Sequence, residues 1–302
     1  MAGSFLAVPG QGSQSVGMGR HLCDRFPAAG AVFDEASESL GFDMRDVMWG
    51  DSAERLTATE HAQPAIVVLG IAALRAWQAS SSGAVDFRWV VGHSIGAIAA
   101  MIAAGSLAVG DGIRLARTRG VVMSAAPGRG AMLAVAVTSR HVRDGITAAA
   151  AEWGLDIACV NGSRQIVLAG PVDGVRAAHA RFGARSRFLD VSHGFHSSLM
   201  DPVAARWADE VAAVPFRDPR IPILSAISGR FLHTAAEVAE DARRGVRETV
   251  RWDLVTGVAE GSGCRPIILG NGHALVRMWR GGPLAGGVTI VDDAYRGAAH
   301  AA

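Results

Sequence analysis

The stretch Phe87-Arg88-Trp89-Val90-Val91-Gly92-His93-Ser94-Ile95-Gly96, followed by the run Ala-Ile-Ala-Ala-Met-Ile-Ala-Ala at 97–104, decides the fold. The apolar run at 87–91 is typical of a short buried strand, and the alanine-rich run is typical of a helix. A Gly-x-Ser-x-Gly motif between them is typical of a nucleophile elbow, a sharp turn that exposes its serine. We therefore predict that Ser94 is a nucleophile. The motif alone leaves open a glycine-rich turn with a solvated serine.

The same turn predicts a way to stabilise an oxyanion. Gly92 and Gly96 carry no Cβ atom, which keeps a crowded turn free of clashes. The start of the following helix presents backbone N–H groups and the positive end of its dipole where an acyl oxyanion would form. The sequence around Ser94 therefore favours acyl transfer chemistry.

A serine nucleophile needs a general base, and the segment 190–200 supplies two candidates. His193 and His196 lie where a predicted strand gives way, through Gly194, to a new helix. Loops at strand ends are where α/β enzymes place catalytic groups. An imidazole can take the serine proton and return it to a leaving group near neutral pH. On this segment alone, a histidine that caps a helix or packs in the core is an equal alternative.

The N-terminal segment forms a third feature. A short apolar strand at 5–8 runs into the loop Pro-Gly-Gln-Gly-Ser-Gln-Ser-Val-Gly-Met-Gly at 9–19, which is too rich in glycine for a helix or a strand. Such a loop can bring its backbone close to a ligand. It lacks the Gly-Lys-Ser/Thr ending of a P-loop and the spacing of a dinucleotide fingerprint, so nucleotide binding ranks low.

Four motifs, in this order, resemble the malonyl-CoA:acyl-carrier-protein transacylase family, which includes trans-acting polyketide acyltransferases and the acyltransferase subunit of malonate decarboxylase. They are Pro-Gly-Gln-Gly-Ser-Gln at 9–14, Gly-His-Ser-Ile-Gly at 92–96, Thr-Arg-Gly at 118–120 and His-Gly-Phe-His-Ser at 193–197. Further matches are Gln63-Pro64 ahead of a long helix, the segment 161–170 and Gly-Asn-Gly-His at 270–273. The resemblance covers nearly the whole chain.

The resemblance implies a role for individual residues. Ser94 would be acylated, with His196 as its general base, and the backbone N–H groups of Gln11 and Ile95 would hold the oxyanion. Arg119 matches the arginine that pairs with the free carboxylate of a malonyl group, although on its own it reads as a helix-surface arginine. Gln63, His93, Phe195 and Asn161 would bind substrate, Phe195 by filling the space of an α-methyl group, and the backbone carbonyl of Glu248 would orient His196.

The implied activity is transfer of a malonyl or related acyl group from CoA to the phosphopantetheine thiol of an acyl carrier protein, in fatty-acid or polyketide biosynthesis. A CoA thioester is the substrate, and no bound metal or redox cofactor is expected. Three departures keep alternatives open: Ala97 stands where the family has Glu, Glu248-Thr249 where it has Asn-Pro, and 268–272 differs from Glu-Val-Gly-Pro-Gly. The alternatives are a transferase for a larger acyl group between carrier proteins, an acyl-thioester hydrolase, and a non-catalytic carrier-binding module.

The order of elements predicts an α/β fold with two subdomains. Residues 126–194 are expected to form a small ferredoxin-like unit, with strands at 132–137, 156–160, 165–169 and 187–191 and helices at 140–153 and 172–182. Residues 1–125 and 195–302 are expected to form a large α/β-hydrolase-like subdomain with a mostly parallel sheet. Its predicted strands lie at 5–8, 87–91, 221–224 and 266–269. The cleft between the subdomains would hold the site.

Composition agrees with this class of protein. The 302 residues are 50% hydrophobic and carry a formal net charge of +1, which argues against nucleic-acid binding, because that function needs an excess of positive charge. Cys23, Cys159 and Cys264 are too few and too widely spaced for a disulfide framework or a metal site. No signal peptide or membrane-spanning run is expected, so a cytoplasmic location is predicted.

Overall fold

Two β-sheets organise the chain, which a computed structural model describes at residues 3–80 and 87–296. The larger sheet has the strand order β11 (Thr289–Ile290), β10 (Arg265–Ile268), β1 (Ser4–Val8), β2 (Phe87–Gly92), β7 (Ile223–Leu224) and β8 (Phe231–Leu232). Every neighbouring pair is parallel except β7 with β8. The prediction of an α/β fold with a mostly parallel sheet is confirmed.

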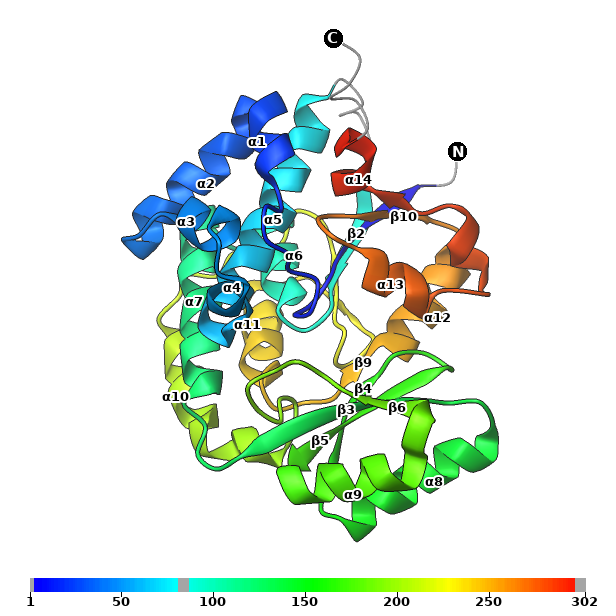
Figure 1. The fold of residues 1–302 in the computed structure, drawn as a ribbon. Helices are drawn as coiled ribbons and strands as arrows, with labels where there is room; N and C mark the ends of the chain where they lie inside the picture. The colour runs from blue at the N-terminus through cyan, green and yellow to red at the C-terminus, as the bar shows by residue number, and fades with distance from the viewer. Residues whose placement is uncertain (1–2, 81–86, 297–302) are drawn as a thin grey trace.

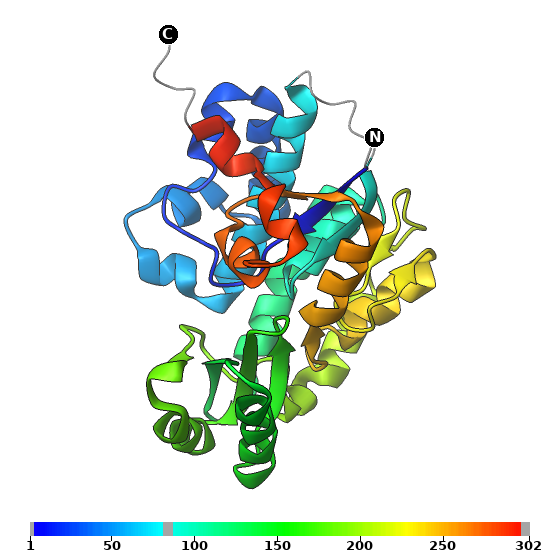
Figure 2. The ribbon, with the colours of Figure 1, turned by 90° about the vertical axis from the view of Figure 1, so that its right-hand side faces the viewer.

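The smaller sheet forms the lobe at the bottom of Figures 1 and 2. Its strand order is β6 (Ser186–Phe188), β3 (Gly130–Ala136), β5 (Gln165–Pro171), β4 (Asp156–Val160) and β9 (Val250–Arg251). The first four strands pair antiparallel, with α8 (Arg140–Glu152) and α9 (Val172–Phe182) between them in sequence, which is the ferredoxin-like arrangement. This lobe has a separate hydrophobic core that includes Leu133, Ile146 and Leu168.

Most strands end within one or two residues of the predicted positions, and the differences at β7, β6 and β9 have consequences for the sheets. β7 starts at Ile223 rather than at 221, because Pro222 has no N–H to donate to a ladder and contributes only its carbonyl, to Val90 N. β6 ends at Phe188 rather than at 191, and only one further ladder-like bond follows, from Leu189 N to Met132 O. No strand was predicted at 250–251, which were assigned to the large subdomain, yet these residues form β9, which pairs parallel with β4 and extends the small sheet.

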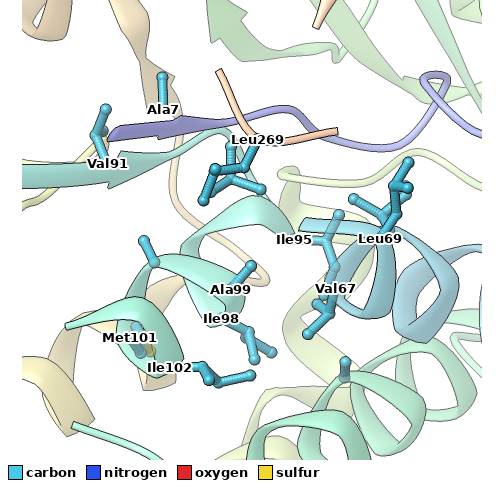
Figure 3. Close-up of a cluster of buried hydrophobic side chains, with 14 of the residues drawn as sticks. Ala7, Val67, Leu69, Val91, Ile95, Ile98, Ala99, Met101, Ile102 and Leu269 are labelled. Atoms are coloured by element: carbon cyan, nitrogen blue, oxygen red, sulfur yellow. The ribbon is translucent and has the colours of Figure 1, made fainter. Parts of the chain in front are cut away.

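Helices cover the larger sheet. The central one is α6 (Gly96–Ala103), which lies between the sheet and α5 (Thr59–Ala79). Figure 3 shows Ile98, Ala99 and Ile102 of α6 between the sheet residues Ala7 and Val91 and the α5 residue Val67. Because α6 is apolar on nearly all sides, it is stable only when buried in this way. The helix that follows the elbow is therefore packed on both sides.

The remaining helices surround this core. They are α1 (Arg20–Arg25), α2 (Pro27–Leu40), α3 (Met44–Trp49), α4 (Ala53–Thr57), α7 (Val109–Ser124), α10 (Asp201–Ala212), α11 (Ala235–Arg244), α12 (Trp252–Ser262), α13 (His273–Met278) and α14 (Val291–Arg296). Short 3-10 turns occur at Gly183–Arg185, Ser198–Met200 and Pro283–Gly286. Within the described residues, no helix has both the length and the apolarity needed to cross a bilayer.

The start of α5 corrects a further expectation. The sequence placed Gln63-Pro64 ahead of a long helix, but α5 begins at Thr59 and contains both residues. A proline inside a helix leaves the carbonyl four residues earlier without its usual donor. Here that carbonyl belongs to Glu60, and the Arg117 guanidinium donates to it at 2.6 Å. A side chain from α7 thus replaces the missing bond and lets the helix start earlier.

Candidate active site

Ser94 lies on the turn between β2 and α6, where its backbone has a φ of 51°. The turn is closed by hydrogen bonds from Gly96 N to His93 O and from Ala97 N to Ser94 O. A Cβ on Gly92 would lie 2.0 Å from the Gly96 carbonyl carbon, and one on Gly96 would lie 2.5 Å from Val8 O. Only glycine fits at these two positions, because Gly92 packs against the turn itself and Gly96 packs against the end of β1.

His196 is the histidine that contacts Ser94. Its Nε2 lies 2.7 Å from Ser94 Oγ, and its Nδ1 lies 2.9 Å from the backbone carbonyl of Glu248. Because a carbonyl only accepts, Nδ1 must carry the proton, which leaves Nε2 free to accept the serine proton. His193 instead accepts a bond from Gly194 N at its Nδ1, and its buried Nε2 has no partner among the described residues.

The backbone at these two residues is unusual. Ser94 and His196, with φ values of 51° and 56°, are the only non-glycine residues of the described chain in the positive-φ region. This conformation costs free energy, and it persists where the surrounding structure imposes it, most often at active sites. The strain therefore marks the same pair that the hydrogen bond joins.

Burial keeps His196 neutral. It lowers the pKa of His196 to about 3, helped by the positive charge of Arg119, while the hydrogen bond to the Glu248 carbonyl acts in the opposite direction. The imidazole is therefore unprotonated at neutral pH. A neutral imidazole is the form that can act as a general base.

Arg119 is buried beside the pair, with 3% of its surface exposed. Its Nη1 donates to Gln63 Oε1 at 3.0 Å, and its Nη2 donates to the Gly245 carbonyl at 2.8 Å and to Ser94 Oγ at 3.4 Å. Burial lowers the pKa of Arg119 to about 10, so the guanidinium remains charged. No carboxylate of the described residues forms an ion pair with it. Arg114 on the same helix is half exposed and pairs with Asp111, as an ordinary surface arginine does.

The two proposed oxyanion donors follow the ends of the neighbouring parallel strands β1 and β2. Ile95 directly follows Ser94 at the start of α6, and Gln11 follows β1 in the adjacent loop. Neither backbone N–H donates to another group in the described part of the chain. The Gln11 side chain donates to Thr59 Oγ1, which also bonds Ser192 Oγ at 2.9 Å. Thr59 thus joins the N-terminal loop to the loop of His196, a role that no sequence motif signalled.

A small cavity of about 30 Å³ adjoins Ser94, Arg119 and His196. By this measure it holds roughly two water molecules. Its other walls are mostly apolar or small, and include Ala97, Ile98, Met101, Trp207 and Ala226. Phe195 was expected to fill the space of an α-methyl group, but it packs in the main core and does not line this cavity. Gln63 does not line the cavity either; its side-chain oxygen accepts the hydrogen bond from Arg119 Nη1.

The remaining predicted substrate residues line a groove that opens beside the elbow. His93 Nε2 bonds Asn161 Oδ1 at 2.9 Å, and Asn161 Nδ2 donates to Gln165 Oε1. His93, Asn161 and Gln11 all line this groove, so the structure brings them together. Within residues 3–80 and 87–296, no cluster of three or more His, Cys, Asp or Glu side chains is arranged to hold a metal ion.

A serine bonded to a neutral histidine, on an elbow of a parallel α/β sheet, defines an enzyme of the serine-dependent acyl-transfer class. Residues 6–263 match the model of the acyl transferase domain, and the chain belongs to this family. The structure therefore belongs to an acyltransferase.

Individual relatives agree with this assignment. The chain is 34% identical, over 83% of its length, to the malonyl CoA-acyl carrier protein transacylase of Bacillus subtilis, of which it covers 80%. It is 38% identical, over 80% of its length, to a phenolphthiocerol synthesis polyketide synthase of Mycobacterium marinum, but spans only 12% of that protein. A malonyl-transacylase solved in complex with a type II polyketide acyl-carrier protein superposes with a TM-score of 0.87 at 26% identity, covering 97% of each chain.

Proposed function

We propose that this chain transfers a malonyl group from malonyl-CoA to the phosphopantetheine thiol of an acyl carrier protein, through a malonyl ester of Ser94. The observation that carries this proposal is the buried, unpaired charge of Arg119 beside Ser94 Oγ. Burying a charge without a partner is costly. An acyl group that ends in a carboxylate supplies the missing partner, whereas an acetyl or long-chain acyl group does not.

The roles of the other residues follow from the geometry. Ser94 attacks the thioester carbonyl as His196 takes its proton, and the backbone N–H groups of Gln11 and Ile95 stabilise the oxyanion. The CoA thiolate then leaves and receives the proton. Attack by the carrier thiol on the ester reverses these steps and regenerates Ser94. The chemistry calls for no metal or redox cofactor, because nucleophile, base and oxyanion donors come from the protein.

Two lines of support come from relatives and from the cysteines. The relative from Bacillus subtilis carries the name of this activity, and a similar transacylase binds an acyl carrier protein. A cytoplasmic location is part of the proposal, because Cys23, Cys159 and Cys264 are all free thiols.

The carrier protein that receives the malonyl group determines the pathway in which the product is used, either fatty-acid or polyketide biosynthesis.

One observation favours a second candidate, a transferase for a larger acyl group. Ala97, which stands where the resembling family has Glu, lines the cavity at Ser94 together with Ala226 and Ala242. Small side chains at these positions leave room for substituents if neighbouring side chains move. The narrow volume and the charge of Arg119 favour the malonyl group.

Intact mass spectrometry tests both candidates. The wild type is incubated with malonyl-CoA, and then with a phosphopantetheinylated carrier protein. We expect the wild type to gain the mass of one malonyl group, and this group to move to the carrier protein when the carrier is added. Ser94→Ala should form no adduct. The control Ser39→Ala, in α2, should form the adduct normally. A full adduct on Ser94→Ala would exclude Ser94 as the nucleophile. An adduct lost to water at the same rate with or without carrier would indicate a hydrolase.

A further inference from the structure

Two grooves lie outside the cavity at Ser94, on the side where the small lobe meets α12 and α13. The first, here called the entrance groove, contains Gln11, His93 and Asn161 near the elbow and the side chains of Arg164 and Arg187 farther out. The second, here called the arginine groove, lies between the segment 137–143, the turn 162–164 and the segment 278–282. Both grooves are lined by Arg164, Met278 and Arg280, so they are continuous.

The two grooves concentrate positive charge. Glu260 is the only acidic side chain among the residues that line them. Six arginines line one groove or both, and none forms an ion pair with a carboxylate of the described residues: Arg140, Arg143, Arg164, Arg187, Arg277 and Arg280. The whole chain has a net charge of only +1, so this concentration is local. It creates a positive potential along a path that leads to the elbow.

The arginine groove has the size and the chemistry of a site for phosphate groups. Its volume of about 770 Å³ falls within the usual range of small-molecule sites. Besides four arginines, it is lined by the hydroxyl-bearing residues Thr138, Ser139 and Ser163; the hydroxyl of Thr256, also in its wall, donates to Trp252 O. Guanidinium groups and hydroxyls are donors, and the planar guanidinium matches phosphate oxygens through two bonds. The groove therefore suits an anion larger than the malonyl carboxylate.

We propose that the arginine groove binds the phosphate groups at the nucleotide end of CoA, while the pantetheine arm lies in the entrance groove with its thioester at Ser94. This inference rests on the proposed function only in that a CoA thioester donates the acyl group. The phosphates of CoA carry about four negative charges, since a phosphate monoester alone carries nearly two. The arm of a carrier protein has a single phosphodiester, so the arginine groove acts in the acylation half of the reaction.

The test compares two acyl donors. Malonyl-CoA and malonyl-pantetheine carry the same thioester, but the second lacks all phosphates. The double variant Arg140→Ala/Arg143→Ala is compared with wild type in single-turnover acylation of Ser94. The matched control is Arg185→Ala, an exposed arginine of the small lobe that lines neither groove. Arg140→Ala alone serves as a second variant, because Arg143 also donates weakly to Gly162 O and Ser163 O.

We expect the half-saturating concentration of malonyl-CoA to rise about tenfold in the double variant, the equivalent of roughly 1.4 kcal/mol. That of malonyl-pantetheine should stay unchanged, which also shows that the variant is folded. Added salt should weaken the binding of malonyl-CoA to the wild type, and should weaken its binding to the variant much less. Equal effects on both donors, or no effect on either, would overturn the proposal. So would unchanged acylation with slower transfer to the carrier protein, which would assign the groove to an acidic carrier surface.

A binding measurement separates this inference from the malonyl assignment. Free CoA and pantetheine are titrated calorimetrically into wild type and into the double variant, with no acyl group present. Tighter binding of CoA than of pantetheine by the wild type, lost in the variant, supports the phosphate site even if the acyl group transferred is not malonyl. Equal CoA affinity of the two proteins contradicts it even if malonyl transfer is established.

Discussion

Replacing Arg119 by alanine is expected to abolish the preference for malonyl-CoA. In the wild type, the guanidinium is almost fully buried and bonded to Gln63 Oε1 and Gly245 O, with Ser94 Oγ at 3.4 Å. Losing a charge-assisted pair at such a desolvated site costs about 2 to 5 kcal/mol. At about 1.4 kcal/mol per factor of ten, malonyl transfer should fall by roughly 30-fold to 5,000-fold.

A second effect of the substitution has to be separated from the first. Removing the guanidinium also leaves the buried Gln63 Oε1 without its donor, which destabilises the fold by about 1 to 3 kcal/mol, and it frees the partly buried Gly245 O. That cost is the same whichever acyl donor is bound. The ratio of kcat/KM between donors therefore isolates the contribution of the carboxylate, while kcat/KM for one donor does not.

The assay measures kcat/KM for malonyl-, methylmalonyl- and acetyl-CoA with wild type, Arg119→Ala and the control Arg114→Ala. Arg114 lies on the same helix, half exposed, and should leave all three values unchanged. Acetyl-CoA should be used better by Arg119→Ala than by wild type, because the variant no longer buries an unpaired charge. A wild type that prefers acetyl-CoA, or a variant that keeps its malonyl preference, would refute the reasoning.

Three further outcomes are expected. His196→Ala should slow acylation by roughly 100-fold or more in single-turnover assays and His193→Ala by less, because only His196 contacts Ser94; the opposite ranking would reassign the base. Gly92→Ala should prevent stable folding in thermal melts, because its Cβ would lie 2.0 Å from the Gly96 carbonyl carbon, whereas Gly145→Ala, with open space around it, should be neutral. The pKa of His196 is lowered to about 3 from an unfolded value near 6.5, so stability is full above pH 6.5 and falls as the pH drops toward 3. Urea titrations should show that His196→Gln flattens this part of the pH dependence, and an unchanged slope would contradict the shift.

The sequence predicted the parts of the site that depend on local backbone geometry. The elbow could be found because Gly92 and Gly96 are imposed by contacts within a few residues or with β1. The ferredoxin-like lobe could be found because its elements follow the order β-α-β-β-α-β within one continuous segment. Such features leave a pattern in the chain, and the structure places Ser94 on the turn where the pattern indicated it.

The contacts that the sequence could not predict come from segments far apart in the chain. The Gly245 carbonyl binds Arg119, and the Thr59 hydroxyl joins Gln11 to Ser192, yet neither residue belongs to a motif. A backbone carbonyl carries no side-chain signal, and a threonine in a helix has no distinctive pattern. Nor could the sequence predict that Phe195 packs in the main core, because the direction of a side chain in a loop depends on the packing around it.

Arg119 connects the choice of substrate to the strength of the base. Its positive charge is, after burial, the second cause of the low pKa of His196. A malonyl carboxylate bound to Arg119 would neutralise that charge, so the pKa of His196 would rise and the imidazole would accept the Ser94 proton more readily. An uncharged acyl group leaves the arginine unpaired and the base weak. In the proposed reaction, the arginine therefore disfavours the wrong acyl donor twice, once in binding it and once in the proton transfer that starts the chemistry.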